Sequence, residues 1–135
     1  MAQSVQDALN LAARLLVVTL FLPAGIGKLT GFDGTVAYIA SVGLPLPAVG
    51  AALAAAVEIG GSLALLAGFG TRIAALVLAA FTLAASVFFH AYWSAPPDQA
   101  YVAQLLFFKN IAVVGGLLAL AAHGAGRWSL DGRRG

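Results

Sequence analysis

Four long apolar segments run along the chain, and short stretches rich in glycine, proline and polar residues separate them. The apolar segments cover residues 8–29, 47–67, 71–93 and 100–122. A helix needs about 20 predominantly apolar residues to cross the hydrocarbon core of a bilayer. Each segment meets that length, so the pattern predicts four transmembrane helices.

The connections between these segments predict how the helices are arranged. The longest connection, TGFDGTVAYIASVGLPLP, holds a short piece with helical apolar spacing that ends at prolines, which is typical of an interfacial helix. GFGTR and WSAPPDQAY are short turns, and short turns place consecutive helices antiparallel. We therefore predict an all-α integral membrane fold: an up-down-up-down bundle of four transmembrane helices, with a short interfacial helix between helices 1 and 2. Residues 1–135 form one domain, in which 123–135 is a basic tail.

Composition supports a membrane protein and excludes several other classes. Hydrophobic residues make up 61% of the chain and charged residues 9%, whereas a soluble domain carries about 25% charged residues. The chain has no cysteine, which excludes disulfides, thiolate metal sites and cysteine nucleophiles. A net charge of +2 is too small to indicate binding to nucleic acid.

Positive charge is unevenly distributed between the two sides of the predicted bundle. Four arginines fall on the side of the turn at 68–71 and the chain termini: Arg72, Arg127, Arg133 and Arg134. The connections on the other side carry Lys28, Asp33 and Asp98. Because basic residues concentrate on the cytoplasmic side of membrane proteins, we predict that both termini are cytoplasmic.

Ionisable and amide side chains interrupt the apolar segments. Six of them, drawn from all four segments, fall in the outer half of the predicted bundle: Lys28, Glu58, His90, Gln104, Lys109 and Asn110. Arg14 falls toward the cytoplasmic side. A lone charge at the bilayer centre costs at least about 2.5 kcal/mol, so these residues need partners or a function. The six residues of the outer half are therefore candidates for binding a ligand or handling protons.

Glu58 and Lys109 are the opposite charges whose depths match. With a rise of about 1.5 Å per residue, they lie about 16 Å and about 12 Å below the outer starts of their helices. We therefore predict a buried Glu58–Lys109 contact, either direct or through one water. Such a pair either fixes helix packing or handles a ligand, a proton or a quinone, and the sequence leaves both interpretations open.

The other polar residues carry separate expectations. Lys28 is expected to extend to the outer surface. His90 is either an interfacial residue or a ligand-facing group. No metal site is expected, because one histidine and one glutamate are too few ligands. Arg14, whose acidic neighbour is Asp7, is expected to extend to the cytoplasmic surface or to face a lipid headgroup or a partner subunit.

An ordered set of short motifs covers nearly the whole chain. It comprises Arg14 in the first helix, GIGKL at the end of that helix, GLPLP, EIGGSLALLAGFGTR at 58–72, FFHAYW at 88–93, KNIAVVGGLL at 109–118 and GRWSLD. In this order the motifs resemble the DoxX family of small four-helix bacterial membrane proteins. The resemblance carries over one set of polar family positions: Arg14, Lys28, Glu58, Arg72, His90, Lys109 and Asn110.

The resemblance also implies a cellular location and a class of function. It implies a bacterial inner-membrane protein. Some relatives are linked to redox chemistry, one as a membrane subunit of a thiosulfate:quinone oxidoreductase and another through an oxidative-stress complex. The fold is similar to that of quinone-linked thiol oxidoreductases, but their cysteine chemistry does not carry over to a chain without cysteine. The family supplies no agreed catalytic residues.

Three functional interpretations follow. The leading one is an accessory or redox-linked membrane subunit whose polar intramembrane pocket binds a quinone headgroup or another small molecule. In that pocket His90 and Lys109 would donate to a quinone oxygen, and Glu58 would tune Lys109 or pass protons. The sequence encodes no redox centre, so a partner must supply electrons. The alternatives are a non-enzymatic assembly protein, as a homo-oligomer or with a membrane partner, and an oligomeric transporter or channel.

Overall fold

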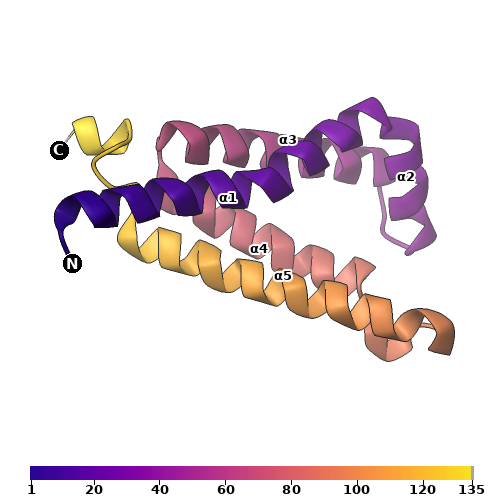
Figure 1. Cartoon of the computed structure of the whole chain (residues 1–135). Helices are drawn as coiled ribbons and strands as arrows, with labels where there is room; N and C mark the ends of the chain where they lie inside the picture. The colour runs from indigo at the N-terminus through magenta and orange to yellow at the C-terminus, as the bar shows by residue number, and fades with distance from the viewer. Residues whose placement is uncertain (135) are drawn as a thin grey trace.

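The computed structural model describes residues 1–134, which form helices and turns. The elements in chain order are α1 (Gln3–Thr30), α2 (Phe32–Ser41), α3 (Pro47–Ala67), α4 (Thr71–Phe89), the short 3-10 helix η1 (Tyr92–Ser94), α5 (Pro97–His123) and η2 (Asp131–Arg133). Helices α1, α3, α4 and α5 are long and apolar enough to cross a membrane, and α2 follows the first of them (Figure 1). The predicted fold class is confirmed. Gly135, the last residue of the predicted tail, lies outside the described residues.

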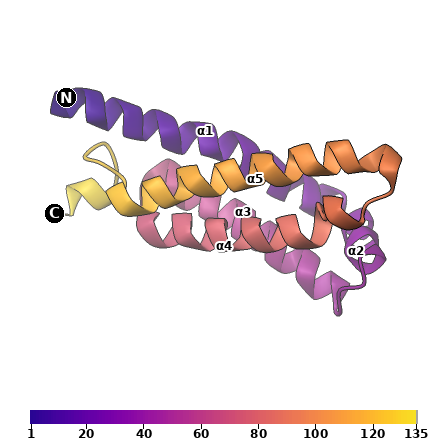
Figure 2. The same ribbon diagram turned by 90° about the horizontal axis from the view of Figure 1, so that it is seen from below.

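The four long helices pack as two pairs. α1 lies along α3, α4 lies along α5, and contacts between α3 and α4 join the pairs (Figure 1, Figure 2). The pairs are close together at the end that holds both chain termini, and they diverge toward α2 (Figure 1). We call these two ends the terminal end and the α2 end. The divergence leaves room between the pairs at the α2 end.

Helix boundaries follow from local sequence. α3 and α5 both begin at a proline, whose fixed φ suits the first turn. The proline has no N–H, but no hydrogen bond is lost, because an N–H at this position has no acceptor within the helix. α3 ends at Gly68, which adopts a left-handed conformation with φ of 66° that suits glycine. α1 starts at Gln3, five residues before the predicted start, and its polar N-terminal part is packed against the C-terminal tail through Asp7.

The hydrophobic core lies where the two pairs meet. Its buried side chains include Phe21 of α1, Leu65 of α3, Leu78 of α4 and Leu117 of α5. Gly61 lets α3 approach α4 closely, because a Cβ at this position would lie 2.8 Å from the Leu78 side chain. Close packing of this kind through a small residue is the usual way that helices associate in a bilayer.

The exterior of the bundle is apolar. Leu16 on α1 is 70% exposed, Leu53 on α3 is 61% exposed and Ile73 on α4 is 71% exposed. A soluble monomer rarely exposes apolar surface on this scale, because water would not solvate it favourably. These side chains instead suit the acyl chains of a bilayer, which agrees with four membrane-spanning helices.

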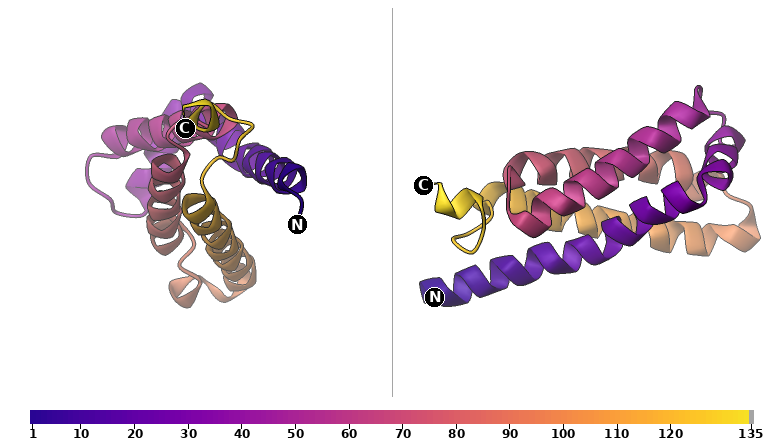
Figure 3. Two further views of the ribbon diagram at one scale, coloured as in Figure 1. Left: turned by 90° about the vertical axis from the view of Figure 1, so that its left-hand side faces the viewer. Right: turned by 90° about the horizontal axis from the view of Figure 1, so that it is seen from above.

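The residues after α5 fold back over the turn between α3 and α4. The backbone N–H of Leu130 donates to the Ala67 carbonyl at 3.0 Å, and that of Asp131 donates to the Gly68 carbonyl at 2.8 Å. The Asp131 carboxylate accepts from the backbone N–H groups of Gly70 and Thr71 at 2.9 and 3.0 Å. The tail therefore closes the terminal end of the bundle (Figure 3).

Arg14 is completely buried beneath this tail. Its guanidinium donates to the Leu65 carbonyl at 3.0 Å, the Trp128 carbonyl at 2.6 Å and the Asn10 side chain at 3.2 Å. The expectation that Arg14 extends to the surface or faces a lipid or a partner was wrong. Carbonyls in the last turn of α3 lie at the same level and can accept a further hydrogen bond, and the tail supplies another carbonyl, so the guanidinium is satisfied inside the protein.

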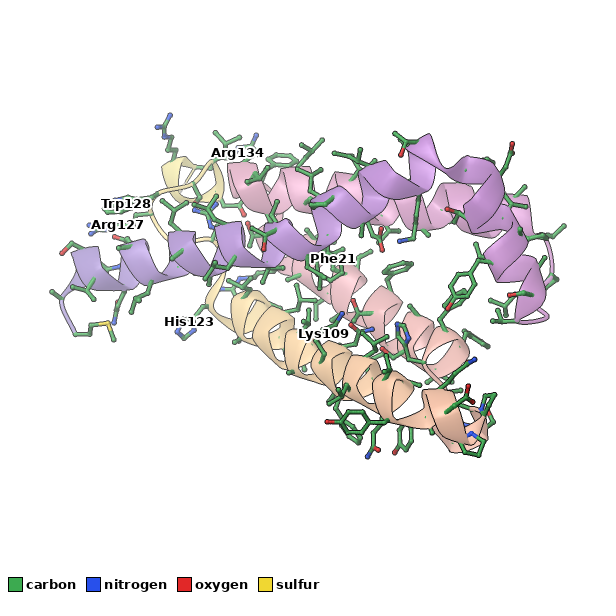
Figure 4. The ribbon with its side chains drawn as sticks, turned by 45° about the vertical axis from the view of Figure 1, so that its right-hand side comes forward. Phe21, Lys109, His123, Arg127, Trp128 and Arg134 are labelled. Carbon is green, nitrogen blue, oxygen red and sulfur yellow. The ribbon has the colours of Figure 1, made fainter. Side chains whose placement is uncertain are left out.

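Two further charged groups stabilise the terminal end. The Arg127 side chain, labelled in Figure 4, donates to the buried Asp7 carboxylate at 2.7 Å, which ties the tail to the N-terminal part of α1. The Arg72 guanidinium donates to the Ala121 carbonyl at 2.7 Å and also to the carbonyl of the next residue, at the C-terminus of α5. Positive charge at a helix C-terminus is favourable because the last carbonyls carry partial negative charge.

Candidate functional site

A cavity of about 400 Å³ lies between the two helix pairs at the α2 end. All five α-helices contribute to its walls, and most of the lining is aliphatic or aromatic. The structure brings five of the six outer-half polar residues to this cavity: Lys28, Glu58, His90, Lys109 and Asn110. Figure 4 labels Phe21 of α1 and Lys109 of α5, two lining residues from opposite pairs.

Glu58 lies at the middle of α3 and is 5% exposed. Both of its carboxylate oxygens accept hydrogen bonds from the Lys28 ammonium, at 3.0 and 2.9 Å. Within residues 1–134, Lys109 forms no ion pair with Glu58. The predicted direct contact between Glu58 and Lys109 was therefore wrong, as was the expectation that Lys28 extends to the outer surface.

The helix arrangement explains why Lys28 takes this role. α3 packs along α1, whereas Lys109 is on α5, which packs along α4. Gly25 sits at the level of Glu58, because a Cβ there would lie 3.0 Å from the Glu58 Cβ. Lys28 is one turn further along α1, and helical side chains tilt back toward the N-terminus. Its ammonium therefore reaches Glu58. Matching depths alone could not show which helices are neighbours.

Lys109 and Asn110 lie at the midpoint of α5 and both line the cavity. Asn110 is 9% exposed, whereas the Lys109 side chain is open to the space between the pairs. Across the described chain, neither side chain forms a hydrogen bond or an ion pair with the protein. The cavity therefore presents one ammonium group and one amide whose hydrogen-bonding groups have no partner in the described chain.

His90 follows the last residue of α4 and lines the cavity from the α2 end. Thr82 and Ser86, which precede it by eight and four residues on α4, are buried. The Thr82 hydroxyl donates to the Leu78 carbonyl and the Ser86 hydroxyl donates to the Thr82 carbonyl, each at 2.7 Å. Both protons are used within α4, so the hydroxyl of Thr82, which lines the cavity, can accept from a ligand but does not donate to it.

Gln104 does not belong to the cavity. Its side chain is exposed, and it is five residues from Lys109 on α5. At about 100° per residue, five residues correspond to about 140° around the helix axis, which turns Gln104 away from Lys109. The expectation of a site role for Gln104 was therefore wrong. It rested on the position of Gln104 along the helix and did not consider the direction of its side chain around the helix axis.

The model of one family, DoxX, matches residues 9–91, which are more than half of the chain and include Lys28, Glu58 and His90. This chain belongs to the DoxX family. The inner membrane protein YphA of Escherichia coli strain K12 is 38% identical over 128 residues, covering 95% of this chain and 91% of YphA. The inner membrane protein YqjF of the same strain is 40% identical over 132 residues, covering 96% of this chain and 94% of YqjF. No solved structure matches the chain.

Aromatic side chains complete the cavity of this DoxX-family protein. The rings of Tyr38 on α2 and Phe89 on α4 have centroids 5.2 Å apart, so they connect α2 to the second helix pair beside the cavity. Phe21 and Phe81 also line the walls. Sequence reasoning did not select these residues, because an aromatic residue in an apolar segment has no feature that separates a cavity wall from a lipid-facing surface.

Proposed function

We propose that this protein is an inner-membrane subunit that binds the ring of a quinone in the cavity at the α2 end and serves a redox partner. The observation that supports this most directly is the composition of the cavity. Aromatic and aliphatic walls surround an ammonium group and an amide in the middle of the membrane-spanning region. Its volume of about 400 Å³ falls within the usual range for small-molecule sites.

The chemistry of a quinone ring suits these groups. The planar ring stacks on Phe or Tyr side chains, and its two carbonyl oxygens accept hydrogen bonds. Lys109 and Asn110 are the donors available to those oxygens, and the Lys28–Glu58 pair lies against the same space. The isoprenoid tail would extend between the diverging helix pairs into the bilayer. Electrons would come from a partner protein, since the chain encodes no redox centre.

Binding tests this proposal directly. The probe is decylubiquinone, titrated into protein purified in lipid nanodiscs, and saturable binding is expected. Lys109→Met should weaken binding by about tenfold, which corresponds to the loss of one charge-assisted hydrogen bond. Gln104→Ala on the same helix is the matched control and should bind as the unchanged protein does. Absence of saturable binding would overturn the proposal.

We also propose that both termini are cytoplasmic, so that the cavity lies in the outer half of the inner membrane. The two relatives are inner membrane proteins by name, and all five arginines lie at the terminal end. Because the chain has no cysteine, single cysteines report the topology. In spheroplasts, a membrane-impermeant maleimide should label Gln99→Cys but label Arg133→Cys only after lysis. The reverse pattern would invert the topology.

A groove on the lipid-facing side of α3 and α4 favours a second candidate function, self-assembly in the membrane. Its lining is small and apolar and includes Gly60, Ala64 and Val77. We propose a helix of a second copy as its occupant, since small residues permit close helix approach. Gly60→Leu should prevent assembly without disturbing the fold, because a Cβ at Gly60 meets nothing within 4 Å. Unchanged mass by light scattering in this variant would exclude the groove.

A further inference from the structure

We propose that the cavity selects a ligand that carries one negative charge on an aromatic ring, and that Lys109 is the counter-ion for that charge. The inference rests on the proposed function in one respect, that the cavity receives a ring-shaped small molecule. It adds the charge of the ligand and the residue that recognises it. The ligand class is an aromatic compound with an ionised oxygen, such as an acidic hydroxyquinone or an aryl carboxylate.

The charge balance of the cavity is the first argument. Lys28 and Glu58 neutralise each other through two hydrogen bonds of 3.0 and 2.9 Å. Lys109 then remains as a positive charge for which residues 1–134 provide no acidic partner within 4.0 Å. A neutral ligand would leave this ammonium unpaired in a membrane-spanning region, where an unpaired charge costs at least about 2.5 kcal/mol. An anionic ligand would remove that cost.

The position of Lys109 is the second argument. It is twelve residues after Pro97, the first residue of the 27-residue helix α5. With a rise of about 1.5 Å per residue, it lies about 18 Å from the start of the helix. A lysine near a helix end reaches the interfacial region by extending along the surface, but Lys109 is central and lines the cavity. The cavity is therefore where its charge acts.

The neighbouring groups define the rest of the ligand. The Asn110 amide lines the same cavity and forms no hydrogen bond with the rest of the described chain. Its NH₂ group can donate to a second oxygen of the ligand, beside the ionised oxygen bound by Lys109. Phe21 and Phe81 in the walls suit a flat ring. An aromatic ring with two oxygens, one of them ionised, satisfies all of these groups.

Three probes of similar size separate charge from quinone chemistry. Lawsone is a naphthoquinone with a hydroxyl group that is ionised at neutral pH, menadione is a neutral naphthoquinone, and naphthoate is an anion that is not a quinone. Binding to the protein in nanodiscs of neutral lipid is measured at pH 7. Lawsone should bind about tenfold or more tightly than menadione, because only lawsone pairs with the ammonium. Naphthoate should also bind.

Two variants at Lys109 and one control assign the preference. Lys109→Met should remove the preference for lawsone over menadione: menadione binding should weaken about tenfold, as for decylubiquinone, and lawsone binding about a hundredfold. Lys109→Arg retains the positive charge and should retain the preference. Gln104→Met, on the exposed side of α5, should change neither.

Each contrary outcome has one meaning. Equal binding of lawsone and menadione would overturn the inference and leave quinone binding in place. A preference that persists in Lys109→Met would overturn the role of Lys109. Binding of naphthoate that depends on Lys109, with neither quinone bound, would overturn the proposed function and leave the anion site. Failure of all three probes would overturn both.

Discussion

At the terminal end, the two buried charged residues are held by protein partners, whereas at the α2 end one ammonium group faces a cavity with no protein partner within residues 1–134. Arg14 donates to backbone carbonyls of α3 and the tail, and Asp7 accepts from Arg127. At the other end, Lys28 and Glu58 pair, but Lys109 stays open to the cavity. The same residue types therefore serve different purposes at the two ends.

Packing differs in the same way. The hydrophobic core is formed where the helix pairs converge, and the tail covers the terminal end through backbone hydrogen bonds. Where the pairs diverge, aromatic and aliphatic side chains line a cavity of about 400 Å³ in place of a packed core. A buried charge with satisfied hydrogen bonds contributes to folding, whereas a charge in the membrane-spanning region without a protein partner costs stability. Substitution of a paired charge should therefore lower stability, whereas substitution of Lys109 should raise it.

The largest effect is expected for Arg14→Leu. The change removes the guanidinium hydrogen bonds to the Leu65 and Trp128 carbonyls that join α1 to α3 and the tail, which should lower the free energy of unfolding by about 3 kcal/mol. Thermal unfolding in detergent measures the loss, and limited proteolysis shows whether the tail is freed. Arg133→Leu, at an exposed position of the same tail, is the control and should have little effect. Equal melting temperatures for the two variants would contradict the capping role of Arg14.

The next effect distinguishes the two lysines as partners of Glu58. Glu58→Ala leaves the Lys28 ammonium without its carboxylate and should cost about 2 kcal/mol of folding free energy. Adding Lys28→Met should restore part of that stability, because it removes the charge left unpaired. Adding Lys109→Met to Glu58→Ala should show no coupling with the first change, beyond its own effect. A double-mutant cycle measures both couplings, and coupling only to Lys109 would refute the observed pair.

A smaller effect of opposite sign is expected for Lys109→Met in the absence of ligand. Removing a charge that has no protein partner should raise the free energy of unfolding by about 1 kcal/mol, whereas Lys28→Met should lower it. The two changes are chemically identical, so they compare the two sites directly. Melting temperatures of the ligand-free proteins provide the measurement. A lower melting temperature for Lys109→Met would show that the Lys109 charge stabilises the folded protein, which would contradict this prediction.

The sequence predicted the fold but only part of the site. Segment lengths and turn residues were sufficient for four spans and the short helix α2, because these depend on local hydrophobicity. They also placed Glu58, His90 and Lys109 in one half of the bundle, where the structure gathers them around one cavity. The partner of Glu58 was not predictable, because it depends on which helices are neighbours and on rotation about each helix axis. That information is tertiary.

The role of the tail was missed for a related reason. Its arginines were counted as a topology signal, and the carboxylate of Asp131 was not considered. Asp131 accepts two hydrogen bonds from backbone N–H groups at the N-terminus of α4. The sequence alone does not show this contact, because it forms only when the tail folds back over the bundle. Aspartate is a common N-cap residue, but a capping side chain normally lies within a few residues of the N–H group it accepts from. Here the two are 61 residues apart in the sequence.

The smallest effect expected at the terminal end is a dependence on pH through Asp131. The backbone hydrogen bonds from Thr71 and Gly70 hold the pKa of this carboxyl below its ordinary value of 3.8. A carboxyl whose pKa is depressed by folding contributes stability above its unfolded pKa, and that contribution is lost as the pH falls through the folded pKa. Between pH 7 and pH 5 the tail should therefore stay docked, and it should loosen only below about pH 4. Because the group is partly exposed, the loss should be about 0.5 kcal/mol.

Protease protection of the tail measured against pH provides the test. Asp131→Asn, which removes the charge, should weaken protection at neutral pH and flatten the acid response. An acid response that persists unchanged in this variant would assign it to another carboxyl, such as the buried Asp7.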